Sequence, residues 1–175
     1  AIDCGHVKGL PEGISLSQTI SMFNPTWQED SHFDTCFDEA VEFASRVLTR
    51  FIAAANGGIS AKTIVASAIQ NAQDPRVIVL EKYTPWKKTV HALSEEALYM
   101  IYPSQTGQWR IQTVPVEPGS FEDKKPLPKE WAGLSDKALQ EVTGIDDAMF
   151  CHNGLFIAGA ESFESTMQMA SIALK

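Results

Sequence analysis

The chain has 175 residues, of which 44% are apolar and 21% are charged, as is typical of a globular domain that buries a substantial core. Its formal net charge of −8 counts against a free-standing nucleic-acid binder, because phosphate contacts require concentrated positive charge. No apolar run reaches the roughly 20 residues that span a bilayer, and three widely spaced cysteines suggest reduced thiols, so we expect an intracellular, cytoplasmic protein with no membrane partner.

The first predicted element is a short helix. Residues 6–13 are punctuated by glycine and proline, which is typical of a linker. Residues 14–23 predict a helix that ends at Asn24-Pro25, because the residue before a proline disfavours helical backbone angles.

Two further helices are expected next. Apolar residues at helical spacing predict a long amphipathic helix from about residue 33 to residue 55. We expect it to bury a stripe against the sheet, comprising Phe37, Val41 and Leu48. The run Asn56-Gly57-Gly58 should break or kink this helix, and a second helix is expected over residues 59–72.

After Asp74-Pro75 the period changes to that of strands. Strands are expected at residues 77–80, 98–102, 108–116, 149–151 and 155–158. The last two are joined by Asn153-Gly154, a strong hairpin signal. Helices are expected at residues 86–93, 136–142 and 163–174. The sum is an α+β fold, a mixed sheet of about five strands packed with helices and preceded by the two-helix segment.

The strand at residues 108–116 presents a candidate binding face. Its residues alternate, so that Arg110 lies between Gln108 and Gln112 on the open face, whereas Trp109 points to the opposite, buried side. A guanidinium on a rigid strand suits a phosphate or a carboxylate. The alternative is an ordinary solvated face.

Cationic and aromatic residues suggest a second contact region. Lys87 and Lys88 follow Trp86 at the expected start of a helix, where an anion can bind. Together with Tyr83 and Trp109 they could form a stacking platform for a single strand, although aromatic residues at such spacing are more often core. Eight of the 14 cationic residues lie between residues 82 and 137, which leaves room for a neutral to positive face on an acidic chain.

The last turn carries the third candidate. His152 could donate a hydrogen bond to a substrate beside Asn153, or Asn153-Gly154 merely makes the turn and His152 is a surface imidazole. His32 and Asp34 look like a metal pair, but the helix dipole explains Asp34 at a helix start. The cysteines form no Cys-x-x-Cys, so structural zinc is not expected.

Several motifs occur in order along the chain: Asn24-Pro25-Thr26-Trp27, Lys82-Tyr83-Thr84-Pro85-Trp86-Lys87, Gln108-Trp109-Arg110-Ile111-Gln112, Pro118-Gly119-Ser120-Phe121, the Leu-Pro-x-x-Trp-x-Gly-Leu run at 127–134 and Phe150-Cys151-His152-Asn153-Gly154. Together they resemble the C-terminal half of the melanocyte-proliferating-gene family. That family groups with the DHH phosphoesterases and acts in eukaryotes as an RNA exonuclease. The resemblance implies a divalent metal, manganese or magnesium, in the full-length protein.

The catalytic signature of that family is missing from this sequence. No Asp-His-His occurs, and the opening Ala1-Ile2-Asp3-Cys4-Gly5 resembles the Ile-Asp-Asn-Gly that closes the catalytic half. Asp3 is therefore the one candidate metal ligand that the resemblance supplies. Paired cations need several carboxylates and imidazoles, so we assign no catalytic residue and expect no cofactor in this chain alone. Ala158-Gly159-Ala160 stands where many relatives show a Gly-Gly-His turn that grips substrate.

By resemblance, the chain is the accessory, substrate-binding half of a metal-dependent hydrolase, an RNA exonuclease, and is inactive alone. Its partners would be the N-terminal catalytic half and RNA. Residues 1–31 would be the tail of that half and a linker, residues 32–73 a helical segment, and residues 74–175 the accessory domain, with 32–175 as one folding unit. The residues expected to position substrate are Arg110, Lys87, Lys88, Gln112, His152 and Asn153.

Two other interpretations remain open. The first is a non-enzymatic interaction domain that docks on a partner protein through its proline-rich segment and through Trp131, which we expect to cross the surface. The second is half of a hydrolase that acts on small phosphodiesters or nucleotides.

Overall fold

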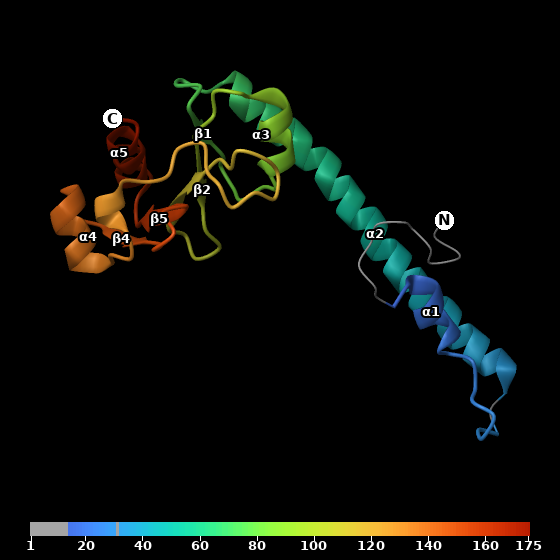
Figure 1. Ribbon diagram of the computed structural model, residues 1–175. Coiled ribbons are helices and arrows are strands. Elements are labelled where there is room, and N and C mark those ends of the chain that lie inside the picture. Colours follow the sequence, from blue (N-terminus) through green and yellow to red (C-terminus); the bar gives the residue numbers. More distant parts are fainter. Residues whose placement is uncertain (1–13, 31) are drawn as a thin grey trace. The chain divides into compact units, whose positions relative to one another are not determined.

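The computed structural model describes residues 14–30 and 32–175. Two compact units, Ala1–Gly57 and Gly58–Lys175, divide the chain, and each is described by itself. Figure 1 follows the elements in chain order from α1 to α5. The candidate metal ligand Asp3 lies outside the described residues.

In the first unit, helix α1 (Leu16–Ser21) begins with a complete capping box. The Ser15 side chain accepts a hydrogen bond from the Gln18 N–H at 3.1 Å, and the Gln18 amide oxygen accepts one from the Ser15 N–H at 2.7 Å. These two bonds satisfy donors that a helix start otherwise leaves free. The short helix expected over residues 14–23 is therefore confirmed. After it, the Phe23 ring lies 5.3 Å from the Phe43 ring.

Helix α2 is one continuous helix, Phe33–Gln70, so the expected break at Asn56-Gly57-Gly58 is wrong. Neither Gly57 nor Gly58 has a positive φ. Helical hydrogen bonds run through the glycine backbone, and an interior glycine costs only about 0.5–1 kcal/mol relative to alanine. The flanking turns of a 38-residue helix outweigh that cost.

The expected burial of the apolar stripe on this helix is also wrong. Phe37 is 68% exposed, Val41 47% and Leu48 60%. Helical spacing shows that apolar residues share a face, but it does not show what covers that face. The buried residues of α2 are Ala61 and Val65, both near its C-terminal end.

Helix α2 is long and apolar enough to cross a membrane, by length and composition only. The most apolar 18-residue window has a mean hydropathy of 1.2, and 11% of it is buried. The sequence predicts no membrane-spanning segment because polar residues interrupt every apolar run. The mean hydropathy of a window can still be high when a few polar residues lie within it. The core helix of a globular protein or a signal sequence meets the same criterion, so one such helix is weak evidence.

Replacing Gly58 with alanine should stabilise α2 by about 0.5–1 kcal/mol, because alanine restricts the unfolded chain and fits helical backbone angles. A Cβ at Gly58 would meet no atom within 4 Å. Far-UV circular dichroism during thermal unfolding measures the gain. Gly107→Ala is the matched control: its site is equally open, but its φ of +90° makes the substitution destabilising. A loss of helical signal in Gly58→Ala would show that the helix is broken there.

The second unit is built on a five-stranded mixed sheet in the order β1-β2-β3-β5-β4. The strands are β1 (Val77–Val79), β2 (Tyr99–Pro103), β3 (Trp109–Thr113), β4 (Ala148–Cys151) and β5 (Ile157–Ala160). β1 pairs with β2 in parallel, and all other pairs are antiparallel. The α+β class, the five strands and the hairpin at Asn153-Gly154 expected from the sequence are confirmed.

Helices cover the two faces of this sheet unequally. One face packs its core against α5 (Phe163–Ala173) and α4 (Asp136–Thr143). The other face packs on Val65 of α2 and Val90 of α3 (Lys87–Leu93), and its strand members come from β1 and β2. Among the described residues, β3, β4 and β5 supply no member of that second core, so their half of this face is uncovered.

The proline-rich segment after β3 sends two of its side chains, Leu127 and Trp131, into the core. It carries a short 3-10 helix, Lys129–Trp131, and Trp131 is only 2% exposed, which corrects its expected surface position. Backbone bonds from Leu127 N–H to the Leu155 carbonyl and from Cys151 N–H to the Leu134 carbonyl, each 2.9 Å, hold the segment to the last hairpin. This packing removes the residue on which docking through the segment depended.

Candidate functional site

The uncovered half of the sheet face carries one row of side chains across four strands. Strand pairing places Tyr102 opposite Arg110, Arg110 opposite Gly159, and Gly159 opposite Phe150. Residues paired across a sheet project to the same side. The row therefore sets a phenol, a guanidinium and a phenyl ring side by side on a rigid platform.

Arg110 is the centre of this row. Its guanidinium carbon lies 4.5 Å from the centroid of the Phe150 ring, and Nη2 donates a hydrogen bond to the Gln108 side-chain oxygen at 3.1 Å. Nη1 is buried and finds no hydrogen-bond partner in the part of the chain that the structure describes. Burial lowers the pKa of Arg110, and the neighbouring Tyr102 acts in the opposite direction. Arg110 is thus half-buried rather than fully displayed, and a buried donor without a partner is costly.

Gly159 makes this arrangement possible. A Cβ at position 159 would lie 2.6 Å from Arg110 Nη1, 2.8 Å from the Trp109 carbonyl oxygen and 3.0 Å from the Phe150 ring. No real side chain tolerates contacts that short. The absence of a side chain at position 159 therefore leaves room for the Arg110 guanidinium over β5. Gly159 thus makes room for the Arg110 side chain of the neighbouring strand.

Two tyrosines and Gln112 border the guanidinium. Tyr102 Oη donates a hydrogen bond to the Gln112 side-chain oxygen at 2.6 Å. Burial and then Tyr83 raise the pKa of Tyr102 to about 12, while Arg110 lowers it, so the phenol keeps its proton at neutral pH. The Tyr83 ring lies edge-on, 5.3 Å from the Tyr102 ring, and is 58% exposed. The border is therefore aromatic and open to solvent at Tyr83.

His152 lies on the same face by alternation, two residues beyond Phe150. Its Nδ1 accepts a hydrogen bond from the Gly154 N–H at 3.0 Å, and its ring lies 4.5 Å from the Phe156 ring. In the neutral ring Nε2 then carries the proton and is a donor. The Asn153 oxygen is 3.5 Å from where a Gly133 Cβ would stand. Both residues serve the turn, and a substrate contact by either stays a prediction.

Lys87 and Lys88 make no recorded contact with the Arg110 row among the described residues. Lys87 and Lys88 are exposed at the start of α3, and Lys87 Nζ lies 5.9 Å from the Trp86 ring centroid. Within the described residues no hydrogen bond or ion pair joins either lysine to Arg110. Their part in binding stays a prediction.

The expected stacking platform of Tyr83, Trp86 and Trp109 does not form, because two of these residues do not lie on its face. Trp86 is 2% exposed in the core, and Trp109 packs on the other face, 4.8 Å from the Phe163 ring. Tyr102, which is 6% exposed, lies beside Tyr83, and Phe150 lies beside Arg110. The alternation of β2 and β4 indicates the face on which Tyr102 and Phe150 lie. Only the strand order β2-β3-β5-β4 brings their rings close to Arg110.

The described residues do not fit a catalytic metal. In residues 14–30 and 32–175, no three His, Cys, Asp or Glu side chains gather closely enough to hold an ion. The buried Cys151 is no substitute, because burial raises the pKa of its thiol to about 11. The groups that the described residues bring together around Arg110 are a guanidinium, neutral donors and aromatic rings.

Comparison with known proteins gives the family. The model of the MYG1 exonuclease group, described as an uncharacterised protein family (UPF0160), matches residues 3–174. The MYG1 protein of Schizosaccharomyces pombe is 33% identical over 99% of this chain and 57% of its own length. The protein named MYG1 exonuclease in Homo sapiens is 35% identical over 91% of this chain and 46% of its own length.

The chain thus spans about half the length of the curated relatives that it matches. No solved structure matches it. Since the family model covers almost the whole chain, the melanocyte-proliferating-gene resemblance is confirmed at the level of the family, and the chain belongs to the MYG1 family, UPF0160.

Proposed function

We propose that this chain is the accessory, substrate-binding half of a DHH-type phosphoesterase, with RNA as its substrate and with the metals held by a separate N-terminal half. One observation carries the proposal: the half-buried Arg110 guanidinium lies on this sheet face with one nitrogen, Nη1, that has no hydrogen-bond partner among the described residues. A phosphate oxygen is the kind of acceptor that would satisfy it. The name exonuclease, which mammalian relatives carry, supports a phosphodiester substrate.

The neighbours of Arg110 favour a nucleic-acid strand over a bare phosphate. Tyr83 offers an exposed ring beside the buried Tyr102, and stacking of bases on such rings is tolerant of sequence. Gln108 fixes one nitrogen of the guanidinium, which orients the fork before substrate arrives. The chain would hold and orient RNA by these groups, and a divalent ion on the other half, manganese or magnesium, would supply the hydrolytic chemistry.

Arg110→Ala should weaken binding of single-stranded RNA by about 1–3 kcal/mol, since a charge-assisted hydrogen bond is lost. The measurement is fluorescence anisotropy of a labelled oligoribonucleotide with the chain joined by the N-terminal half of a longer relative, such as the Saccharomyces cerevisiae protein. Arg46→Ala is the matched control, because Arg46 is 78% exposed in its side chain and pairs only with Glu42. Its affinity should equal that of the unmodified chain.

The same reconstituted sample separates the alternatives. Hydrolysis of RNA that needs both halves and a divalent ion supports the proposal. Cleavage of small phosphodiesters without RNA cleavage would favour a small-molecule hydrolase. Normal RNA binding by a folded Arg110→Ala variant would contradict the role of this face, and metal-dependent turnover by this chain alone would contradict the accessory role.

A further inference from the structure

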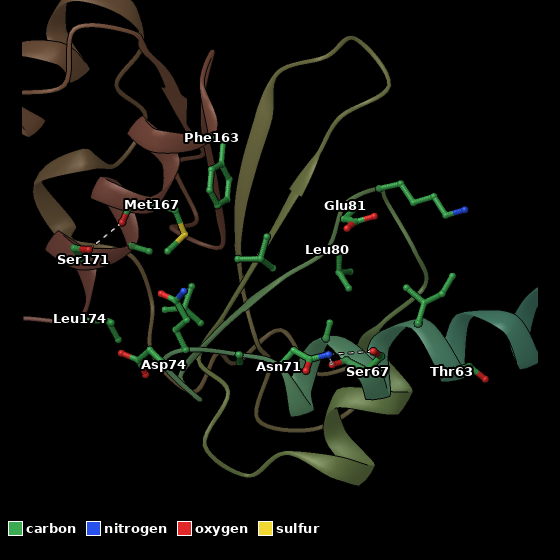
Figure 2. Close-up of a pocket in the computed structure, with 18 residues that line it drawn as sticks. Thr63, Ser67, Asn71, Asp74, Leu80, Glu81, Phe163, Met167, Ser171 and Leu174 are labelled. Carbon is green, nitrogen blue, oxygen red and sulfur yellow. Dashed lines mark hydrogen bonds between the residues drawn. The ribbon is translucent and has the colours of Figure 1, made fainter.

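A groove of about 960 Å³ runs along the free edge of β1 within the second unit. Figure 2 shows it between two helices, with Thr63, Ser67 and Asn71 of α2 on one side and Phe163 and Met167 of α5 on the other. β1 forms the floor through Val77 and Val79. The lining of this groove shares no residue with the Arg110 row.

The floor presents backbone groups at Val79, whereas the Val77 N–H already donates to the Asp74 carbonyl at 3.0 Å. β1 is an end strand of the sheet and has β2 as its one neighbour. The Leu80 N–H donates to the Ile101 carbonyl at 2.8 Å, and the Arg76 carbonyl accepts from the Tyr99 N–H at 3.0 Å. Because main-chain groups alternate in direction along a strand, those of Val79, between these residues, point away from β2 into the groove. They are the donor and the acceptor that a further strand would use.

The walls have the geometry of a layered sheet that continues past β1. Val65 of α2 packs in the core on one face, and Met169 of α5 packs in the core on the other. Both helices also line the groove beyond the last strand. A space with β1 as its floor and a helix over each face has the outline of one additional strand.

We propose that this groove accepts an extended segment of a partner protein as a sixth strand beside β1. Main-chain bonds to Val79 supply affinity, and the two walls select side chains, as in strand addition at other sheet edges. A second copy of this chain does not fit, because its own β1 lies between the same two helices. The occupant is a free, extended segment.

The lining defines the side chains of that segment. The α5 wall is mostly apolar, with Phe163, Met167, Ala170 and the adjoining Leu174 beside Ser171. The α2 wall mixes polar and apolar residues, namely Thr63, Ser67 and Asn71 with Ile64, Ala68 and Ala72. Successive side chains of a strand point to opposite faces, so the segment alternates large apolar residues toward α5 with small residues, polar or apolar, toward α2.

The ends of the groove add no surplus charge. Asp74 is neutralised by Arg76 at 2.7 Å, and Glu81 is followed by Lys82. An uncharged segment therefore fits better than an acidic or a basic one.

Val79→Pro tests the backbone bond directly. Proline removes one N–H, and an edge strand tolerates it when that N–H points away from the sheet. Heptapeptides selected from a random display library on the unmodified chain should show the alternating pattern. They should bind Val79→Ala as they bind the unmodified chain, and bind Val79→Pro at least ten-fold more weakly. Ser67→Trp, which changes an exposed helix residue and fills the groove, should abolish binding while the circular dichroism spectrum stays the same.

Three results would overturn the proposal. One is a selection that enriches no peptide, and another is a set of peptides that bind Val79→Pro and Ser67→Trp as well as the unmodified chain. The third is concentration-dependent dimerisation in analytical ultracentrifugation that Val79→Pro abolishes, which would make a second copy the occupant. If Val79→Pro does not fold, Ser67→Trp decides the matter alone.

Discussion

Trp131→Ala should destabilise the second unit by about 3–5 kcal/mol, the usual cost of truncating a buried aromatic side chain. Trp131 is 2% exposed and belongs to the larger core cluster with Leu127 and Leu139. Removing its indole leaves a cavity that the surrounding rings and strands fill only in part. Urea unfolding followed by circular dichroism measures the change, which is a large share of the 5–15 kcal/mol that stabilises an ordinary domain.

Phe121→Ala is the matched control for this experiment. Phe121 is an aromatic residue of the same proline-rich segment and is fully exposed. Its truncation should change stability by less than about 0.5 kcal/mol, as for other surface substitutions. If Trp131→Ala unfolds no earlier than Phe121→Ala, Trp131 lies on the surface, and docking of a partner through this segment becomes the better interpretation.

The elements of the second unit were predictable because their signals are local. Alternation marked β3, a continuous apolar run marked β1, and Asn153-Gly154 marked the turn before β5, where the Leu155 N–H bonds to the His152 carbonyl at 2.8 Å. A strand or a turn is specified by residues that are neighbours in sequence. The boundaries therefore agree with expectation to within a few residues.

The errors concern relations between distant residues. Trp131 was placed on the surface because proline-rich segments are usually loops, but its burial depends on Leu139 and on strands at both ends of the domain. Gly57 and Gly58 predict a break because glycine has a low helix propensity, and that local propensity does not include the support of the long helix on both sides. The stripe of Phe37 is real as a pattern, and no sequence pattern states what covers it.

The candidate site shows the same division. Arg110 was found from the period of its own strand, and its exposure was overestimated because its neighbours come from other strands. Phe150 and Tyr102 reach it only through the order β2-β3-β5-β4. The sequence singles out Gly159 only by its place in Ala158-Gly159-Ala160, and the structure shows that the Arg110 side chain lies against it. Sheet order is what turns these separate signals into one site.

Gly159→Ala should damage both the fold and the candidate site. The new methyl group would stand 2.8 Å from the Trp109 carbonyl oxygen, a backbone atom that cannot turn away, and 2.6 Å from Arg110 Nη1. Overpacking of this kind typically costs 1–3 kcal/mol, so the urea midpoint should fall accordingly. The guanidinium would have to leave the Phe150 ring, so RNA affinity of the reconstituted protein should fall together with stability. Gly144→Ala gives, for comparison, the cost of backbone strain without a clash, since φ there is +70° and no atom lies within 4 Å, whereas φ at Gly159 is not positive.

The double variant Gly159→Ala/Arg110→Ala separates the two contacts. If the clash with Nη1 contributes, removing the guanidinium should recover part of the lost stability, and the two changes should be non-additive because their atoms touch. RNA affinity should not recover, because the donor itself is gone. Recovery of affinity in the double variant would show that Gly159 acts on binding through the backbone of β5 and not through Arg110. Full additivity would show that the guanidinium does not rest on Gly159 in solution.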